Sequence, residues 1–357
     1  MIMRKHLFLR VIIGLMIASL SLLMVSPSLA EVVQLPLDQT VTGELLKEEN
    51  WTVIPGESAL TDERVLQYGT AQPKVLKYDR DAGTWAPAEK DAAVSKFDWL
   101  IYEDPSITVR SEYATLLPSF KAKQIQSSIT RIRVADASQI RTAMSFDNYR
   151  KGGYVEAADM AKAKNAVAAV NGDFFKYHGK TGYILRQGEF YRNKLNGKRD
   201  VLFIDNEGNF SAIYGATAQD GEAYMSSLPE GRSVVNTFTL GPVLVENGKA
   251  RIISETIVAK SGEFQWKYAQ QRVAVLQLGP LEYAIVETYG RTDGSMGMTI
   301  QEFADYIVYL FPDCVMAYNL DGGGSTNVVL KGARIHVTPG HRQISDILYF
   351  ASAWREE

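Results

Sequence analysis

The sequence predicts an α+β fold in which a mixed, largely antiparallel β-sheet has helices packed against it. Two observations favour this class. Many short apolar or alternating segments are joined by Gly-containing turns of the kind found in β-hairpins, whereas only two segments show clear helical periodicity. Composition agrees with a chain that buries a substantial core, since 46% of its 357 residues are hydrophobic and 22% are charged.

The first 30 residues have the pattern of a signal peptide. Three basic residues precede an almost wholly apolar stretch over 11–25, and Ser28-Leu29-Ala30 fits a cleavage site. We therefore expect a mature chain that starts at about Glu31 and is secreted or associated with the cell envelope. No stable membrane span is expected after cleavage, and retention as an uncleaved anchor is the alternative.

Charge and cysteine content exclude several function classes. Without the signal segment, 35 Lys and Arg remain against 41 Asp and Glu, a net charge of −6, so we expect no nucleic-acid partner. The single Cys314 excludes an intrachain disulfide and a Cys-based zinc site. An exported chain without disulfides is consistent with a bacterial exported enzyme. His178, His336 and His341 are too scattered to predict a zinc triad. No cofactor is expected, and a divalent cation at Asp321 is an alternative that the spacing does not indicate.

The region 31–104 is mixed and irregular. Short apolar pieces, separated by Pro, Gly and charged residues, lie at 51–54, 75–78 and 99–102. We expect a lead-in region of hairpins or extended chain there, with the main domain over residues 105–357. The sequence does not indicate what the lead-in region does.

The main domain begins with residues that alternate with period two over 127–134, as in a half-buried strand. An Ala-rich segment over 155–164 has apolar residues at helical spacing and predicts a helix. It runs directly into the apolar residues 166–170, which we interpret as a buried strand. Three hairpin-like units follow, with Gly-containing turns at 187–188, 205–208 and 246–248.

The rest of the domain contains further strands and a capped helix. Strands are predicted over 272–278, 283–288 and 344–350. Thr299 and Glu302 form a capping box, in which each side chain accepts a hydrogen bond from a backbone N–H near the other residue. The helix that follows carries an apolar face and stops at Pro312.

The strongest functional signal is the loop Asp321-Gly322-Gly323-Gly324-Ser325-Thr326. Apolar runs over 314–318 and 328–330 flank it and are predicted to be buried strands joined by a turn. Three consecutive glycines let backbone approach a ligand closely. The loop can hold a sugar or phosphate on its N–H groups while Asp321 performs acid–base work. A plain hairpin turn is the alternative, and no Walker-type Gly-Lys follows.

A series of motifs in a fixed order carries a family resemblance between about Arg131 and Phe350. The motifs are Asn171-Gly172-Asp173-Phe174-Phe175, Gly182-Tyr183-Ile184-Leu185-Arg186-x-Gly188, Gly241-Pro242-x-Leu244-x-x-x-Gly248, Arg272-x-Ala274, Gly290-Arg291, Ser295-x-Gly297, Asn319-Leu320-Asp321-Gly322-Gly323-Gly324-Ser325 and Arg342-x-Ile344-Ser345-Asp346. Together they resemble the phosphodiester glycosidase domain. The resemblance implies hydrolysis of a glycosyl-1-phosphodiester, such as one of N-acetylglucosamine, in the cell envelope or in an extracellular polysaccharide.

The resemblance also implies roles for individual residues. Asp321 is the expected carboxylate nearest the reacting centre. Asn171 is expected to bond a sugar hydroxyl or to orient Asp321, and Asp173 to complete a carboxylate pair or to support a turn. Arg272 is expected to clamp phosphate with its planar guanidinium, a structural ion pair being the alternative. The other predicted substrate contacts are Gly322, Gly323, Gly324, Ser325, Thr326, Arg291 and Ser295.

Two positions depart from the family pattern. Tyr289 stands where bacterial relatives usually have Asp before Gly-Arg, and Leu276 stands where a Gly usually follows the Arg272 motif. A missing carboxylate and a bulky side chain beside the loop favour a second hypothesis, a catalytically silent carbohydrate- or phosphate-binding module. A third hypothesis is a conventional glycosidase that uses Asp173 and Asp321 as a carboxylate pair.

Overall fold

The computed structural model describes residues 51–53, 66–68, 73–79, 82, 84–88, 99–116, 124–151, 153–173, 175, 181–292, 294–336 and 339–353. The predicted signal peptide and most of the predicted lead-in region lie outside these residues, as does His178. Every strand pair in the described part of the chain is antiparallel. With helices packed on these sheets, the predicted α+β class is confirmed.

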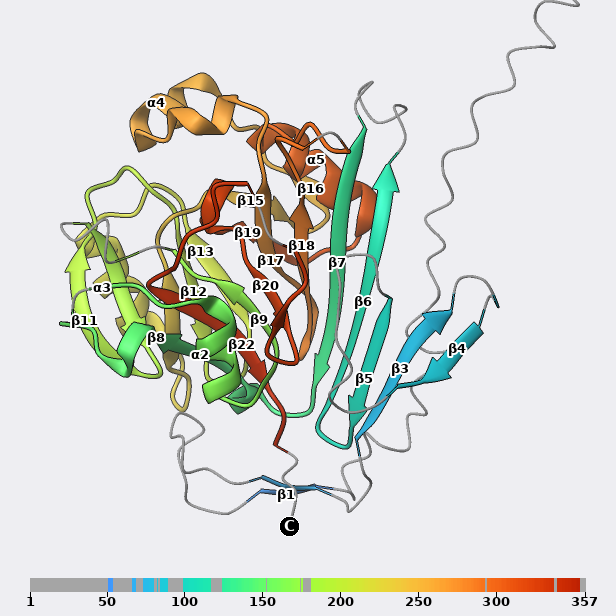
Figure 1. Ribbon diagram of the computed structural model, residues 1–357. Helices are drawn as coiled ribbons and strands as arrows, with labels where there is room; N and C mark the ends of the chain where they lie inside the picture. Colours follow the sequence, from blue (N-terminus) through green and yellow to red (C-terminus); the bar gives the residue numbers. More distant parts are fainter. Residues whose placement is uncertain are drawn as a thin grey trace, which may run out of the picture.

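The largest sheet has ten strands in the order β16-β15-β19-β17-β18-β7-β6-β5-β3-β4 (Figure 1). Their bounds are β3 (Lys74–Asp79), β4 (Thr84–Pro87), β5 (Leu100–Asp104), β6 (Ile107–Leu116), β7 (Ile125–Val134), β15 (Val243–Glu246), β16 (Lys249–Ala250), β17 (Arg272–Gly279), β18 (Glu282–Thr288) and β19 (Met316–Asn319). The domain boundary predicted after residue 104 falls in the turn of the β5–β6 hairpin, where Asp104 pairs with Ile107. Strands β3, β4 and β5 therefore extend the same sheet that carries the glycine-rich loop.

A second sheet has five strands in the order β21-β20-β9-β22-β8. They are β8 (Ile140–Met144), β9 (Ala166–Asn171), β20 (Val328–Leu330), β21 (Ala333–Arg334) and β22 (Asp346–Ala351). Smaller units complete the strand list: β1 (Trp51–Val53) with β2 (Leu66–Tyr68), β10 (Gly182–Arg186) with β11 (Glu189–Lys194), and β12 (Val201–Asp205) between β13 (Phe210–Ile213) and β14 (Val234–Phe238). The three hairpins predicted from their turns are confirmed.

Successive side chains of a strand point to opposite faces of the sheet, so alternate residues can pack in different cores. In β17, Val273 and Val275 face a central core that lies between the ten-stranded and five-stranded sheets, whereas Ala274 and Leu276 face the outer core under α5. Strand β9 also contributes to two cores, with Ala168 and Val170 in the central core and Ala166 and Ala169 in a core under α2. The two sheets therefore pack face to face and carry helices on their outer sides.

Four α-helices lie in the described residues: α2 (Ala157–Ala163), α3 (Ala218–Ser227), α4 (Glu255–Ser261) and α5 (Ile300–Leu310). Short 3-10 turns occupy η3 (Ala137–Gln139), η4 (Ser145–Asp147), η5 (Phe264–Lys267) and η6 (Gly323–Ser325). The Thr299–Glu302 capping box of α5 is confirmed. Helices α3 and α4 were not predicted; the sequence of α3 is polar and has little apolar periodicity, and α4 has only seven residues. No helix of the described residues has the length and hydropathy needed to cross a bilayer.

Candidate functional site

The glycine-rich loop connects the two large sheets. Strand β19, which precedes it, belongs to the ten-stranded sheet, and β20, which follows it, belongs to the five-stranded sheet. The alternative of a plain hairpin turn is therefore wrong. Two backbone hydrogen bonds fasten the loop to the start of β17, from Leu320 N to Val273 O at 3.0 Å and from Gly323 N to Gln271 O at 3.1 Å. The loop thus lies at the rim where both sheets end.

Close backbone packing explains Gly322 and Gly324, and a Cβ on Gly322 would lie 2.8 Å from the carbonyl oxygen of Gln271. A Cβ on Gly324 would lie 2.1 Å from the carbonyl oxygen of Gly340, which leaves no room for a side chain. Gly323 has a φ of +61°, a conformation that favours glycine. The glycines therefore let the loop pass tightly between neighbouring backbone segments, and its backbone borders open space on the remaining side.

That open space is a cavity of about 400 Å³. Its walls come from the glycine-rich loop, the start of β17, the segment after α4, and two arginines from other loops. The lining residues are Leu240, Glu263, Gln265, Trp266, Gln270, Arg272, Arg291, Asn319, Leu320, Asp321, Gly322, Gly323, Gly324 and Arg342. A cavity of this size fits a sugar with an attached phosphate.

Asp321 presents a carboxylate oxygen without a partner. Its Oδ2 is buried and has no hydrogen bond within the described residues. Burial raises the pKa of Asp321 to about 6; the Ser325 hydroxyl and Arg342 oppose this rise, and the charge of Glu263 adds to it. A smaller contribution that also raises it comes from Asp173. Asp321 is thus a carboxylate at neutral pH and a stronger base than an ordinary aspartate.

Arg272 is a buried cation without a carboxylate partner in the described part of the chain. It is 2% exposed, and its Nε and Nη2 atoms donate to backbone carbonyls only. The accepting carbonyls belong to Met298, Gln265, Trp266 and Tyr268. Burial and the nearby Arg291 lower the pKa of Arg272 to about 9, against the charges of Glu263 and Glu302. Its Nη1 group makes none of these bonds, so the cavity offers a fixed donor to an anion.

Two more arginines contribute positive charge to the cavity. Arg291 is exposed, and its Nη2 donates to Oε1 of Gln270 at 3.0 Å. Arg342 is also exposed, and its backbone N–H donates to the carbonyl of Gly324 at 3.1 Å. Three arginines and two carboxylates, Asp321 and Glu263, therefore line one cavity. This excess of positive charge suits a phosphorylated ligand.

Asn171 is buried at the end of β9 and braces the loop. Its Nδ2 donates to the backbone carbonyl of Asp321 at 2.8 Å, and its Oδ1 accepts from the N–H of Asn327 at 2.9 Å. Of the two roles predicted for Asn171, these contacts fit the orientation of Asp321, and Asn171 does not line the large cavity. It fixes the backbone at both ends of the glycine-rich loop.

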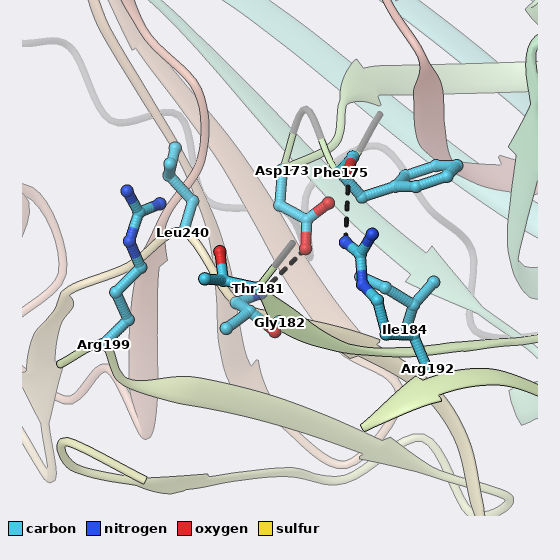
Figure 2. Close-up of a pocket in the computed structure, with 9 residues that line it drawn as sticks. Asp173, Phe175, Thr181, Gly182, Ile184, Arg192, Arg199 and Leu240 are labelled. Atoms are coloured by element: carbon cyan, nitrogen blue, oxygen red, sulfur yellow. Dashed lines mark hydrogen bonds between the residues drawn. The ribbon is translucent and has the colours of Figure 1, made fainter. Parts of the chain in front are cut away.

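Asp173 lies in a closed cluster beside the loop. One of its carboxylate oxygens accepts from Arg186 at 3.1 Å and the other from the N–H of Thr239 at 2.8 Å. Arg186 also donates to Asp346 at 2.8 Å. Figure 2 shows Asp173 in the wall of a second cavity of only about 10 Å³, which admits a single water. The two oxygens of Asp173 are thus occupied within the protein.

The Asp173–Arg186–Asp346 cluster is connected to the loop through backbone. The N–H of Gly172 donates to the carbonyl of Asp346, and the N–H of Asp321 donates to the carbonyl of Gly172 at 3.3 Å. Burial raises the pKa of Asp346 to about 6, although Arg186 pulls it down. A Cβ on Gly172 would lie 2.2 Å from the Asp346 carboxylate, so a glycine is required there.

The remaining predicted contacts divide into two groups. Gly322, Gly323, Gly324 and Arg291 line the large cavity. Ser325, Thr326 and Ser295 do not line it. The hydroxyl oxygens of Ser325 and Thr326 are buried without a hydrogen-bond partner among the described residues. The Ser295 hydroxyl donates to the carbonyl of Tyr289 at 2.6 Å and accepts from the N–H of Gln126, which braces the loop before α5.

The two residues that depart from the family pattern lie away from the cavity. Tyr289 and Leu276 are both fully buried, and neither is part of the cavity wall. The ring of Tyr289 stacks on His336 with centroids 3.8 Å apart, and Leu276 packs in the core under α5. The expectation that these side chains stand beside the loop is therefore wrong, because Leu276 points into the core under α5 and Tyr289, which follows β18, packs against His336.

Several residues at the site were not among the predicted contacts. Arg186, Arg342 and Asp346 belong to the motifs that carry the family resemblance, so the signal for them was present in the sequence. Glu263 and Gln270 belong to no motif, and only tertiary contact brings them to the cavity. No group of three or more His, Cys, Asp or Glu side chains in the described residues is arranged to hold a metal ion.

Comparisons with known proteins bear on this site. Residues 164–351 match the family model of the phosphodiester glycosidase domain. The SPbeta prophage-derived uncharacterized protein YomE of Bacillus subtilis is 27% identical over 182 residues, which cover 50% of this chain and 26% of that protein. The chain thus spans about a quarter of the length of that curated relative.

Solved structures with a related fold include a zebrafish enzyme. The catalytic domain of zebrafish N-acetylglucosamine-1-phosphodiester alpha-N-acetylglucosaminidase, auto-inhibited by its pro-peptide, superposes with a TM-score of 0.53 at 18% identity. That match covers 80% of this chain and 89% of the zebrafish domain. A hypothetical protein from Synechocystis gives a TM-score of 0.48 at 14% identity, over 74% of this chain and 65% of its own. At these identities the zebrafish match establishes a shared fold.

Proposed function

The chain belongs to the phosphodiester glycosidase family, and from this premise we propose that it hydrolyses a glycosyl-1-phosphodiester into a sugar and a phosphomonoester. A sugar such as N-acetylglucosamine fits the size of the cavity. One observation carries the proposal: a single cavity is lined by both Asp321 and the buried Arg272, whose guanidinium has no carboxylate partner in the described residues. Export, expected from residues 1–30, would bring the enzyme to envelope or extracellular substrates.

The phosphate is assigned to Arg272, with Arg291 beside it. Arg272 is held by four backbone carbonyls, so it loses little conformational freedom when it binds an anion. Binding of a phosphate oxygen to Arg272 requires little reorganisation, because the cost of burying this cation has been met during folding. The N–H groups of the glycine-rich loop border the same cavity and supply further donors.

Asp321 is assigned as the general base. Its carboxylate takes a proton from water, the water oxygen bonds to C1 of the sugar, and the bond between C1 and the phosphate oxygen breaks. The electron pair of that bond leaves with the phosphomonoester, whose negative charge Arg272 stabilises. A pKa of about 6 suits a base that works near neutral pH.

The two other hypotheses lose support from the contacts around them. The conventional glycosidase needs Asp173 as the second carboxylate, but Arg186 and the N–H of Thr239 occupy both of its oxygens. The catalytically silent binding module was favoured by Tyr289 and Leu276, and neither residue lines the cavity. The binding module remains the outcome to expect if turnover is absent.

A substrate panel tests the proposal. Purified mature protein is incubated with a series of sugar-1-phosphodiesters, with the matching sugar-1-phosphates and with uncharged aryl glycosides as controls. We expect release of sugar and phosphomonoester from at least one phosphodiester and none from the aryl glycosides, which lack the phosphate that Arg272 binds. Calorimetric binding of the phosphodiesters without any turnover would instead establish the binding module.

A further inference from the structure

We propose that Glu263 is a second catalytic carboxylate of the cavity, where its negative charge stabilises the positive charge that develops on the sugar ring during hydrolysis. This inference rests on the proposed hydrolysis and names a residue that no sequence motif indicates. In the transition state of glycoside cleavage the sugar becomes oxocarbenium-like, so a fixed negative charge close to the ring lowers the barrier.

Glu263 lies in the wall of the same cavity as Asp321 and Arg272. It follows Gly262, which ends α4 with a φ of +77°, and it directly precedes η5. Its N–H donates to the hydroxyl of Ser261 at 3.1 Å. The side chain is 23% exposed, so the carboxylate is sheltered but still accessible from the cavity.

Both the side chain of Glu263 and the backbone segment that follows it are held in place. Arg199 forms an ion pair with Oε1 of Glu263 and lines the small neighbouring cavity beside Asp173 (Figure 2). Unlike Asp173, Glu263 keeps its second oxygen, Oε2, without a hydrogen bond in the described residues. The segment after Glu263 is fastened by Arg272, whose Nη2 donates to the carbonyls of Gln265 and Tyr268. The phosphate-binding arginine and Glu263 therefore have a fixed relative position, as preorganised catalytic groups require.

The charges of Glu263 and Asp321 act on one another. Burial is the main cause of the raised pKa of Asp321, and the charge of Glu263 raises it further. The other groups around Asp321 are Ser325 and Arg342, which lower the pKa, and Asp173, which raises it weakly. Glu263 thus has a second effect, because its charge keeps Asp321 basic.

The test is the Glu263→Gln substitution in the complete mature protein, with Glu255→Gln as matched control. Glu255 lies in the same α4 segment and pairs with Lys267, but its side chain is 88% exposed and outside the cavity. We expect Glu263→Gln to lower kcat on the best phosphodiester of the panel about 100-fold, with a smaller change in KM. Glu255→Gln should match the wild type. Wild-type kcat in Glu263→Gln would overturn the inference.

A titration of Asp321 by carbon-13 NMR provides a readout that needs no turnover. Glu263→Gln should lower the pKa of Asp321. Arg199→Gln, which leaves the charge of Glu263 unpaired, should raise it. If no phosphodiester is hydrolysed, the proposed function fails, and these opposite shifts still decide whether the two carboxylates are coupled. An unchanged Asp321 pKa in both variants would overturn the inference.

Discussion

Two arginines are buried near the glycine-rich loop, and their partners differ. Arg186 binds the carboxylates of Asp173 and Asp346, whereas Arg272 binds only backbone carbonyls. Burial alone lowers the pKa of an arginine, but the two carboxylates outweigh it at Arg186 and raise its pKa. At Arg272 burial prevails, and the pKa falls to about 9. A cation whose charge is balanced within the protein supports structure, and one without an acidic partner is available to an anionic ligand.

The same contrast separates the two aspartates of the predicted carboxylate pair. Asp173 is 3% exposed and has a partner on each oxygen. Asp321 borders the 400 Å³ cavity and keeps Oδ2 without a partner in the described residues. Both residues are aspartates, so residue type does not distinguish their roles. The hydrogen bonds that each carboxylate already makes within the protein distinguish them better.

The largest expected effect follows from removing the cation of the Asp173–Arg186–Asp346 cluster. Arg186→Met leaves Asp173 and Asp346 buried without their cation, so the free energy of unfolding should fall by about 3–5 kcal/mol. Urea denaturation at pH 7 measures it. Arg272→Met is the control, because it strands no carboxylate and should cost clearly less. Equal losses of unfolding free energy in the two variants would show that the two arginines do not differ in how carboxylates pair with them.

Asp321→Asn should reduce kcat about 1,000-fold while the protein stays folded. The wild-type kcat/KM should rise as the pH increases through about 6, because the base must lose its proton, and this rise should be absent in the variant.

Stability gives the control for Asp321→Asn. The folded-state pKa of Asp321 is raised above its ordinary value of 3.8, so the folded state binds the proton more tightly and loses stability as the pH rises to about 6. The variant removes this loss, and thermal denaturation at pH 7 should show a Tm no lower than that of the wild type. A lower Tm would mean that Asp321 supports the fold and that its effect on kcat is indirect.

The smallest of the three effects concerns ligand affinity. Arg272→Met should weaken binding of inorganic phosphate about 10-fold to 100-fold, since a hydrogen bond to a charged group contributes about 1.5–3 kcal/mol. Arg272→Lys should recover part of this affinity, because it keeps the charge and loses the planar guanidinium. Isothermal titration calorimetry measures both. Arg186→Lys, which alters the closed cluster, should leave phosphate affinity unchanged, and an equal loss there would contradict the assignment.

Local properties of the sequence determined most of the secondary structure and the position of the site. Period-two alternation placed β7, short strand-like segments placed β17 and β18, and the Thr299–Glu302 capping box placed α5, because these patterns depend only on residues close in the chain. The order of the motifs likewise pointed to the family and to the loop at Asp321. The polar helix α3 lacked such a pattern.

Only the tertiary structure decided which charged groups remain open to a ligand. Asp173 and Asp321 each lie in a family motif, but Arg186 and Thr239 come from other strands and loops to close the first. Glu263 enters the cavity from a segment without any motif. Partners distant in sequence decide whether a charged side chain is neutralised within the protein or remains able to bind a ligand. This property depends on long-range packing, which no local sequence pattern encodes.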